Sequence, residues 1–145
     1  MEAEILPLGD PVWRDAYLIG GETRLTEVAI ADLVAQERVR SVTGHLFIRR
    51  GDDALDPTET IQRVALNVIY IEEDPTFEAV AARMPKTEPV IAIERTLIEA
   101  GLLKKSLGRL KPTSDGKQEA ARLIAANSHL RGPRGVAYNG PDAAS

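Results

Sequence analysis

Hydrophobic and polar residues alternate along several stretches of the chain, and such alternation is typical of β-strands. The segment from Val12 to Leu33 holds two strand-prone stretches on either side of Gly20-Gly21. This dipeptide suits a two-residue hairpin turn, because both turn positions need positive φ. With that turn, Arg14 would lie opposite Glu27, and an opposite-charge pair across two strands supports the register. The first predicted element is therefore a β-hairpin.

Two further strands are predicted in the middle of the chain. Residues 38–50 alternate, and residues 61–73 carry apolar side chains on both faces, as a central strand buried on both sides would. The segment between them, residues 51–60, is rich in Gly, Asp and Pro and indicates a loop. The two strands are therefore expected to pair antiparallel.

Helical patterns follow in the second half. Asp74-Pro75 is typical of a helix start, and Phe77, Val80, Ala81 and Met84 follow at helical spacing as far as Pro85. A second helix is predicted from Thr87 to Gly101, with Val90, Ile93 and Leu97 on one face, although its PVIAI stretch also suits a strand. A third is predicted from Ser114 or Asp115 to about Leu130. Residues 102–110 are expected to form a strand or an irregular edge.

These elements predict an α+β fold, with an antiparallel sheet of four to six strands and helices packed on one face. The 145 residues suit one domain, which we place at residues 1–130. From Arg131 the Gly, Pro and Ala content indicates a flexible C-terminal tail over residues 131–145. No internal repeat is evident from the sequence.

Composition and charge exclude several classes of protein. The chain has no Cys, which excludes a disulfide framework and thiol chemistry, and no apolar run is long enough to span a membrane. The acidic N-terminus lacks the basic stretch of a signal peptide, so a cytoplasmic location is expected. The net charge is −4, yet residues 102–145 hold eight bases and three acids. Such a basic end either faces acidic surface of the same protein or binds an anionic partner.

Candidate chemistry is confined to a few charged and aromatic side chains. The two His residues lie far apart and no metal-binding spacing occurs, so no metal site is predicted. His45 lies inside an apolar stretch and is the candidate catalytic acid, base or hydrogen-bond donor. The alternative is a core or half-buried histidine that is hydrogen-bonded to a neighbour. Arg40 and Arg63 are candidate anion anchors, because arginine binds carboxylates bidentately. The candidate pocket walls are Tyr17, Tyr70 and Trp13.

The order of these elements resembles the chorismate lyase family and the related UTRA-type ligand-binding domains. The stretches that carry the resemblance are WRDAYLIGGETRLTEVAIADLV, HLFIRRGDDALDPTETIQRVALNVIYIEED and PTFEAVAARMPKTEPVIAIERTLIEAGLL, and together they lie within residues 12–110. The resemblance implies a cavity for a small unsaturated or aromatic acid and no cofactor. The arginines and the late glutamate of the family lyases have no counterparts here: the family's strand arginines align near His45 and Leu66.

The leading hypothesis is a cofactor-independent biosynthetic enzyme that acts on an unsaturated or ring-bearing small molecule by elimination, cyclisation or rearrangement. One alternative is a non-catalytic module of the same fold that binds a small-molecule effector. A second is an interaction or nucleic-acid-binding protein that uses the basic C-terminal third. The first two hypotheses imply a small-molecule partner and no membrane, and they leave a homodimer open. Nucleic acid is the less favoured partner, because the chain as a whole is acidic.

Overall fold

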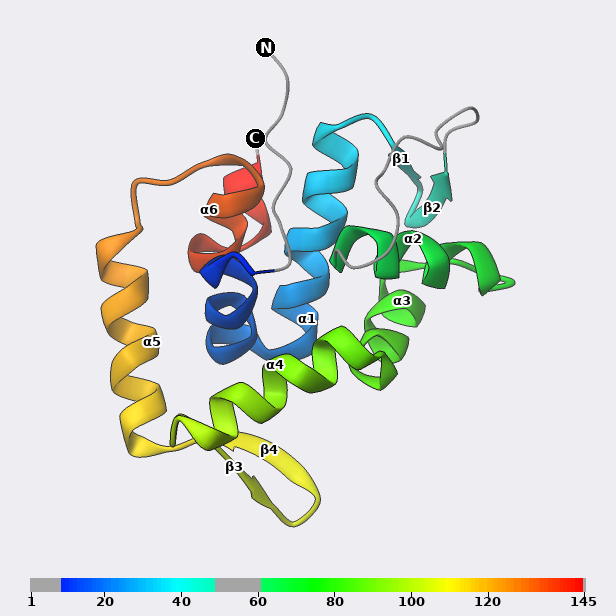
Figure 1. Ribbon diagram of the computed structural model, residues 1–145. Coiled ribbons are helices and arrows are strands. Elements are labelled where there is room, and N and C mark those ends of the chain that lie inside the picture. The colour runs from blue at the N-terminus through cyan, green and yellow to red at the C-terminus, as the bar shows by residue number, and fades with distance from the viewer. Residues whose placement is uncertain (1–8, 49–60, 145) are drawn as a thin grey trace.

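The structure is a computed structural model that describes residues 9–48 and 61–144. It is a mixed α+β fold, mostly helical, with two small antiparallel sheets of two strands each (Figure 1). The elements in chain order are α1 (Pro11–Ala35), β1 (Val39–Val42), β2 (His45–Ile48), α2 (Ile61–Ile71), α3 (Phe77–Arg83), a 3₁₀ turn (Met84–Lys86), α4 (Glu88–Glu99), β3 (Leu103–Ser106), β4 (Arg109–Pro112), α5 (Ser114–Ala126), α6 (Gly132–Asn139) and a second 3₁₀ turn (Pro141–Ala144).

The predicted hairpin at residues 12–33 is wrong, because this segment forms α1. Asp10 caps the helix by accepting a hydrogen bond from the Val12 amide at 2.9 Å. The helix is broken at Gly21, whose φ of 68° and ψ of −156° are open only to glycine. The prediction of positive φ is thus correct for Gly21 and wrong for Gly20, and the break joins two helical halves rather than two strands. The apolar residues occur at both helical and alternating spacing, and burial against α6, α2 and α4 decides in favour of the helix.

The predicted central strand at residues 61–73 is also wrong, since residues 61–71 form α2. Ile61, Ala65, Leu66, Val68 and Ile69 are buried on one helical stripe. Because the β-branched residues fill the core from this stripe, tertiary packing overrides their preference for strands. The predicted sheet of four to six strands is not found in the described ranges. They hold two separate hairpins, β1–β2 and β3–β4, and one isolated bridge between His45 and Thr76.

Three helices in the second half confirm the predicted pattern, with small shifts at their ends. α3 is capped by Thr76 rather than Asp74, and α5 by Thr113 rather than Ser114 or Asp115. α4 carries Pro89 in its first turn and buries Val90 and Leu97, as its spacing indicates. The stretch predicted as a strand or irregular edge, residues 102–110, forms β3 and the first half of β4. None of the described helices combines the length and the apolar character that a membrane span requires.

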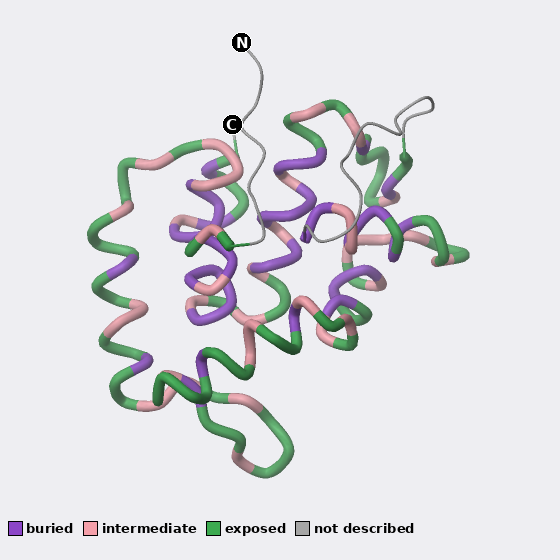
Figure 2. The backbone as a smooth tube through the Cα atoms, viewed as in Figure 1, coloured by how far each residue is buried: buried purple, intermediate pink, exposed green. Residues whose placement is uncertain are grey.

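The last residues of the chain differ from the predicted flexible tail. α6 packs along α1 and buries Val136, Ala137 and Tyr138 (Figure 2). The Arg134 guanidinium donates to both carboxylate oxygens of Asp10, at 3.0 and 2.9 Å. Gly and Pro content therefore marks a helix N-terminus and turns here, not a lack of structure.

The backbone repeats itself after 64 residues, although no internal repeat is evident from the sequence. Positive φ values occur at Glu37 and Gly101, at Thr43 and Leu107, and at Gly44 and Gly108, each pair 64 apart. The two hairpins share one register at the same offset, Val39–Ile48 in the first and Leu103–Pro112 in the second. The Arg38 amide donates to the Leu33 carbonyl, and the Leu102 amide donates to the Leu97 carbonyl.

We name the repeated halves the N-unit, residues 10–48, and the C-unit, residues 74–112. Each begins with Asp-Pro and contains a short helix, a tight break, a longer helix and a two-stranded hairpin. Identical residues at equivalent positions include Leu33 and Leu97, which are both fully buried, and Gly44 and Gly108 at the hairpin turns. In Figure 1 the N-unit hairpin lies at the upper right, while β3–β4 projects from the bottom of the molecule. The repeat therefore places two equivalent hairpins at distant ends of one protein.

Candidate functional site

The candidate catalytic residue, His45, lies where the two units meet. Its Nε2 atom is 2.7 Å from an Asp74 carboxylate oxygen, and its side chain is 43% exposed. The neighbouring Leu46 amide donates to the Pro75 carbonyl, so β2 is bonded to the start of the C-unit. These contacts agree with the alternative interpretation, a half-buried histidine bonded to a neighbour, and they place His45 at the junction of the two units.

The other candidate site residues are not brought together. Arg40 is exposed on β1, Arg63 is half-buried on α2, and Tyr70 at the end of α2 is 82% exposed. Trp13 and Tyr17 are buried in α1. Trp13, Tyr17 and Arg40 each line a different hollow of the surface. The structure therefore does not assemble one pocket from these six residues.

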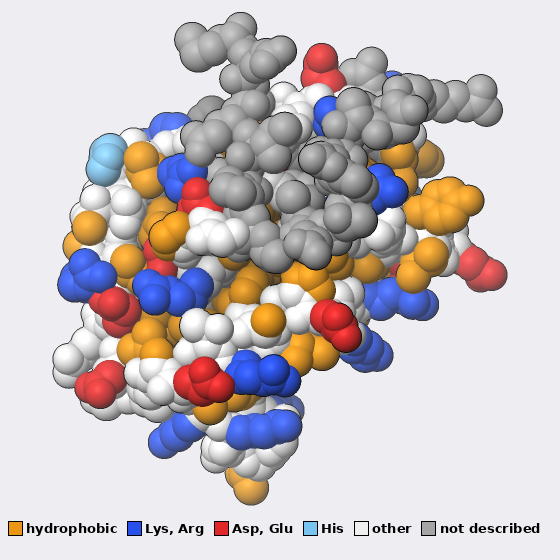
Figure 3. Space-filling model, in the orientation of Figure 1, with side chains coloured by type: hydrophobic (Ala, Val, Ile, Leu, Met, Phe, Trp, Pro, Cys, Tyr) orange, Lys and Arg blue, Asp and Glu red, His pale blue; other side chains and the backbone are white. Residues whose placement is uncertain are grey.

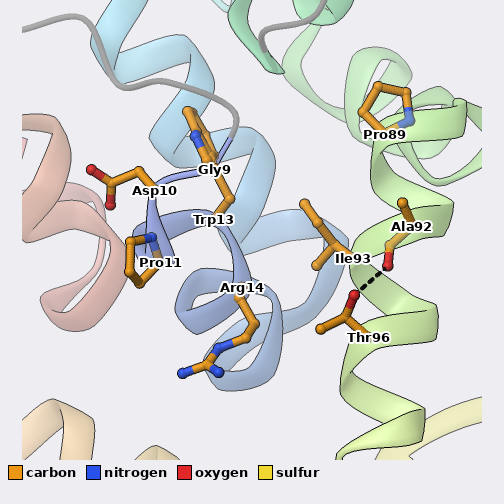
Figure 4. A pocket seen from close by; sticks show the side chains of 9 residues that line it. All are labelled: Gly9, Asp10, Pro11, Trp13, Arg14, Pro89, Ala92, Ile93 and Thr96. Carbon is orange, nitrogen blue, oxygen red and sulfur yellow. Dashed lines mark hydrogen bonds between the residues drawn. The ribbon is translucent and has the colours of Figure 1, made fainter.

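The hollow beside Trp13 lies between the start of α1 and α4 and is mainly apolar (Figure 4). Two of its polar side chains already have partners, whereas the buried Arg14 Nε atom has no hydrogen-bond partner among the described residues. The Thr96 hydroxyl donates to the Ala92 carbonyl at 2.9 Å, and Asp10 binds Arg134. Burial would raise the pKa of Asp10, but its hydrogen bonds with Arg134 and the Val12 amide lower it below the usual value. This carboxylate is thus a structural anion rather than a proton donor near neutral pH.

Tyr17 faces a second hollow, under the β3–β4 hairpin. Its hydroxyl donates to Glu94 of α4 at 2.6 Å. Burial, together with this carboxylate, raises the pKa of Tyr17 far above its usual value, so the phenol stays protonated. The hollow of about 740 Å³ runs from the break in α1 to the hairpin, where Lys105 and Arg109 line it. It joins the two units of the repeat.

The hairpin β3–β4 carries a cluster of cationic side chains. Lys104 pairs directly with Lys111 across the two strands, and Ser106 pairs with Arg109. Because side chains alternate between the faces of a ribbon, Lys104, Arg109 and Lys111 share one face. Leu103 and Leu110 belong to the other face and pack against the core. We call the first of these the cationic face.

None of the described acidic side chains forms an ion pair with the cationic face. Residues 102–112 contain no Asp or Glu. Lys104, Lys105, Arg109 and Lys111 are all exposed, and none of them makes an ion pair or side-chain hydrogen bond with any residue that the structure describes. Figure 3 shows Lys and Arg side chains around the hairpin where it projects from the body. The repeat provides the contrast, because the positions equivalent to Lys104, Lys111 and Arg109 are Arg40, Phe47 and His45.

The base of the hairpin is held firmly. The Thr113 hydroxyl donates to the Gly101 carbonyl at 2.6 Å, and its oxygen accepts from the Gly116 amide at 3.0 Å. The Thr113 amide donates to the Leu102 carbonyl. A Cβ atom at Gly116 would lie 2.0 Å from that same carbonyl oxygen, so only glycine allows α5 to approach so closely. The hairpin thus projects from a fixed base formed by the ends of α4 and α5.

Sequence reasoning detected the basic C-terminal third but not its arrangement. The stretch LLKKSLGRLKP combines apolar and cationic residues, and its Leu107-Gly108 dipeptide forms the turn of the hairpin. Read as a hairpin, this stretch places lysines opposite one another. Among the described residues no group of three or more His, Asp or Glu side chains could hold a metal ion.

Comparison of the chain with protein-family models, with curated proteins and with solved structures finds no match.

Proposed function

We propose that this protein binds double-stranded DNA through the cationic face of β3–β4. The observation that carries the proposal is the direct pairing of Lys104 with Lys111, beside Arg109, with no acid in the hairpin. Like charges directly opposite one another destabilise a hairpin. A phosphate backbone would offset this repulsion, and lysines and arginines that contact phosphates supply most of the affinity of non-specific DNA binding.

The order of elements supports the same reading. In the C-unit, α3 and α4 are joined by the short segment at residues 84–87, which is the arrangement of a helix–turn–helix, and the hairpin follows. α4 buries only two residues and exposes Arg95, but it also exposes Glu88 and Glu99. The hairpin therefore supplies the attraction, and we expect binding with little sequence preference. Likeness of fold does not specify a ligand, so the charge of the hairpin remains the stronger argument.

The test is the salt dependence of binding to a short labelled DNA duplex, measured by fluorescence anisotropy. The wild-type protein should bind at low ionic strength and lose affinity linearly on a log–log plot as salt rises. The double substitution K104A/K111A should weaken binding and reduce the slope by about two, one for each lost phosphate contact.

A matched control lies in the other hairpin, because Arg40 occupies the position equivalent to Lys104. Arg40→Ala removes one positive charge without touching the cationic face. The affinity for the duplex and the salt slope should therefore stay close to the wild-type values. Absence of duplex binding by the wild type at low ionic strength would overturn the proposal. If R40A lost half as much affinity as K104A/K111A, the loss per charge would be equal, and binding would depend on total charge rather than on the cationic face.

The hollow under the hairpin favours a second candidate, the binding of a small organic acid. Lys105 and Arg109 would face its carboxylate, while Leu18, Ile98 and Leu110 offer apolar walls. A panel of chorismate, 4-hydroxybenzoate and related aromatic acids, screened by thermal stabilisation, tests this candidate. A ligand at 100 times its dissociation constant should add about 2.7 kcal/mol of stability. The lyase or cyclase activity predicted from the sequence stays a prediction that a turnover assay with any stabilising acid would test.

A further inference from the structure

Leu107, at the turn between β3 and β4, is the most exposed large hydrophobic residue described. It is 97% exposed and contacts no part of the described core. Its φ is 52°, in the left-handed region that a two-residue turn of this kind usually fills with Asn, Asp or Gly. A leucine at this place costs conformational energy and gains no burial within the protein.

The repeat shows that the turn itself does not require leucine. The equivalent residue of the N-unit is Thr43, which has a φ of 49° and is followed, like Leu107, by a glycine with positive φ. The same turn is thus built with a polar residue in the hairpin that lacks the cationic face. Leucine and the cations occur together in one hairpin and are both absent from the corresponding positions of the other, except for Arg40. This association points to one shared ligand.

We propose that Leu107 is a wedge that inserts between base pairs from the minor groove when the cationic face binds DNA. This inference rests on the proposed DNA binding and specifies its mode. Apolar side chains, leucine among them, enter base steps from the minor groove in proteins that kink DNA. The strands of a ribbon lie about 5 Å apart, axis to axis, and the minor groove of B-DNA is about 6 Å wide, so only the turn residue and not the ribbon itself would enter the groove.

The charges flanking Leu107 suit this placement. Lys105 and Arg109 lie two residues before and two residues after it, so cations follow both strands down from the tip. The minor groove has an enhanced negative potential where it is narrow, and it attracts such side chains. With the tip in the groove, Lys104 and Lys111 further down the hairpin would reach the phosphates on either side. The fixed base at Thr113 and Gly116 would hold the hairpin in place, so that the DNA rather than the protein would deform.

The experiment compares the wild type with Leu107→Thr, which installs the residue that the N-unit carries in the same backbone conformation. Two quantities are measured with one duplex: affinity by anisotropy, and unstacking by the fluorescence of 2-aminopurine together with end-to-end energy transfer. Saturating wild-type protein should raise 2-aminopurine emission at least twofold and shorten the end-to-end distance. L107T should keep its affinity within about fivefold and cause neither change.

The outcomes separate the two proposals. Wild-type binding without unstacking, or equal unstacking by L107T, would overturn the wedge and leave DNA binding intact. No duplex binding at all would overturn both. The same protein is also mixed with vesicles of phosphatidylserine and phosphatidylcholine, since an apolar tip between lysines also suits an anionic membrane surface. Vesicle binding that L107T loses, with no change in duplex fluorescence, would assign the tip to a lipid surface and reject the wedge.

Discussion

Lys104 and Lys111 face each other across the hairpin. A single substitution at one of them can distinguish the effect of this pair on the stability of the protein from its effect on DNA binding. The pair has no acidic neighbour within residues 102–112. A cross-strand pair of opposite charge contributes roughly 0.2–1 kcal/mol, whereas like charges destabilise. The wild-type hairpin therefore gives up stability at the place where the proposed ligand binds.

Lys111→Glu should raise the free energy of unfolding by a few tenths of a kcal/mol, up to about 1 kcal/mol, while weakening duplex binding. The gain comes from an opposite-charge pair with Lys104, and the loss comes from placing a carboxylate beside phosphates. Urea unfolding and anisotropy on one preparation measure both. Lys117→Glu on α5 is the control, because Lys117 is exposed but outside the hairpin. A loss of stability in K111E would show that the lysine contributes something other than repulsion.

At the scale of elements, sequence patterns identified helices best where a start or stop signal agreed with the apolar spacing. α4 follows Thr87, carries Pro89 in its first turn and ends before Gly101, and all of this was predicted correctly. α1 and α2 were predicted as strands because alternation and helical spacing coexist in short apolar stretches. The helix is distinguished from the strand only by the neighbouring elements that bury Leu25 of α1 and Ile61 of α2.

The contact between α5 and the hairpin base can be tested at one atom. Gly116→Ala would place a Cβ atom against the Leu102 carbonyl oxygen and should destabilise the protein by about 1–3 kcal/mol. Gln118→Ala, an exposed change in the same helix, should have little effect. Thermal or urea unfolding measures the difference. If G116A is as stable as Q118A, then α5 is free to shift and the base of the hairpin is less rigid than its geometry indicates.

At the scale of the whole molecule, the chain is closed by contacts between its beginning and its end. Arg134 of α6 binds Asp10 at the N-cap of α1, and the Tyr138 hydroxyl donates to the buried Asp15 at 2.7 Å. These bonds hold α6 on the N-unit. They explain why residues 131–139 are ordered against the core despite a composition typical of a tail.

Arg134→Ala should cost about 1 kcal/mol at pH 7, since the pair is only partly buried. The pKa of Asp10 is lowered in the folded protein, so the stability that its ionised form contributes is present at neutral pH and is lost as pH falls through that lowered pKa. The difference between wild type and R134A should therefore be full near pH 6–7 and shrink below about pH 4. Urea unfolding at several pH values measures it. A difference that persists unchanged at pH 2.5 would mean that Arg134 stabilises by packing rather than by charge.

Local sequence signals were enough to predict the helices with matching end signals, the basic C-terminal third and the positive φ at Gly21, although the same signal also gave Gly20 a positive φ that it does not have. These features depend on residues near one another in the chain, where backbone preference and charge act directly. The tertiary structure alone decided that α1 and α2 are helices, that residues 131–139 pack on α1, and that two units repeat after 64 residues. It also placed Lys104 opposite Lys111, because strand register follows from the turn at Leu107-Gly108 and from which face Leu103 and Leu110 bury. The repeat is hidden because only a few buried and turn positions must stay alike for two segments to pack in the same way. The exposed positions are free to diverge, and of those equivalent to the four cations of β3–β4 only Arg40 is a lysine or arginine in the first hairpin.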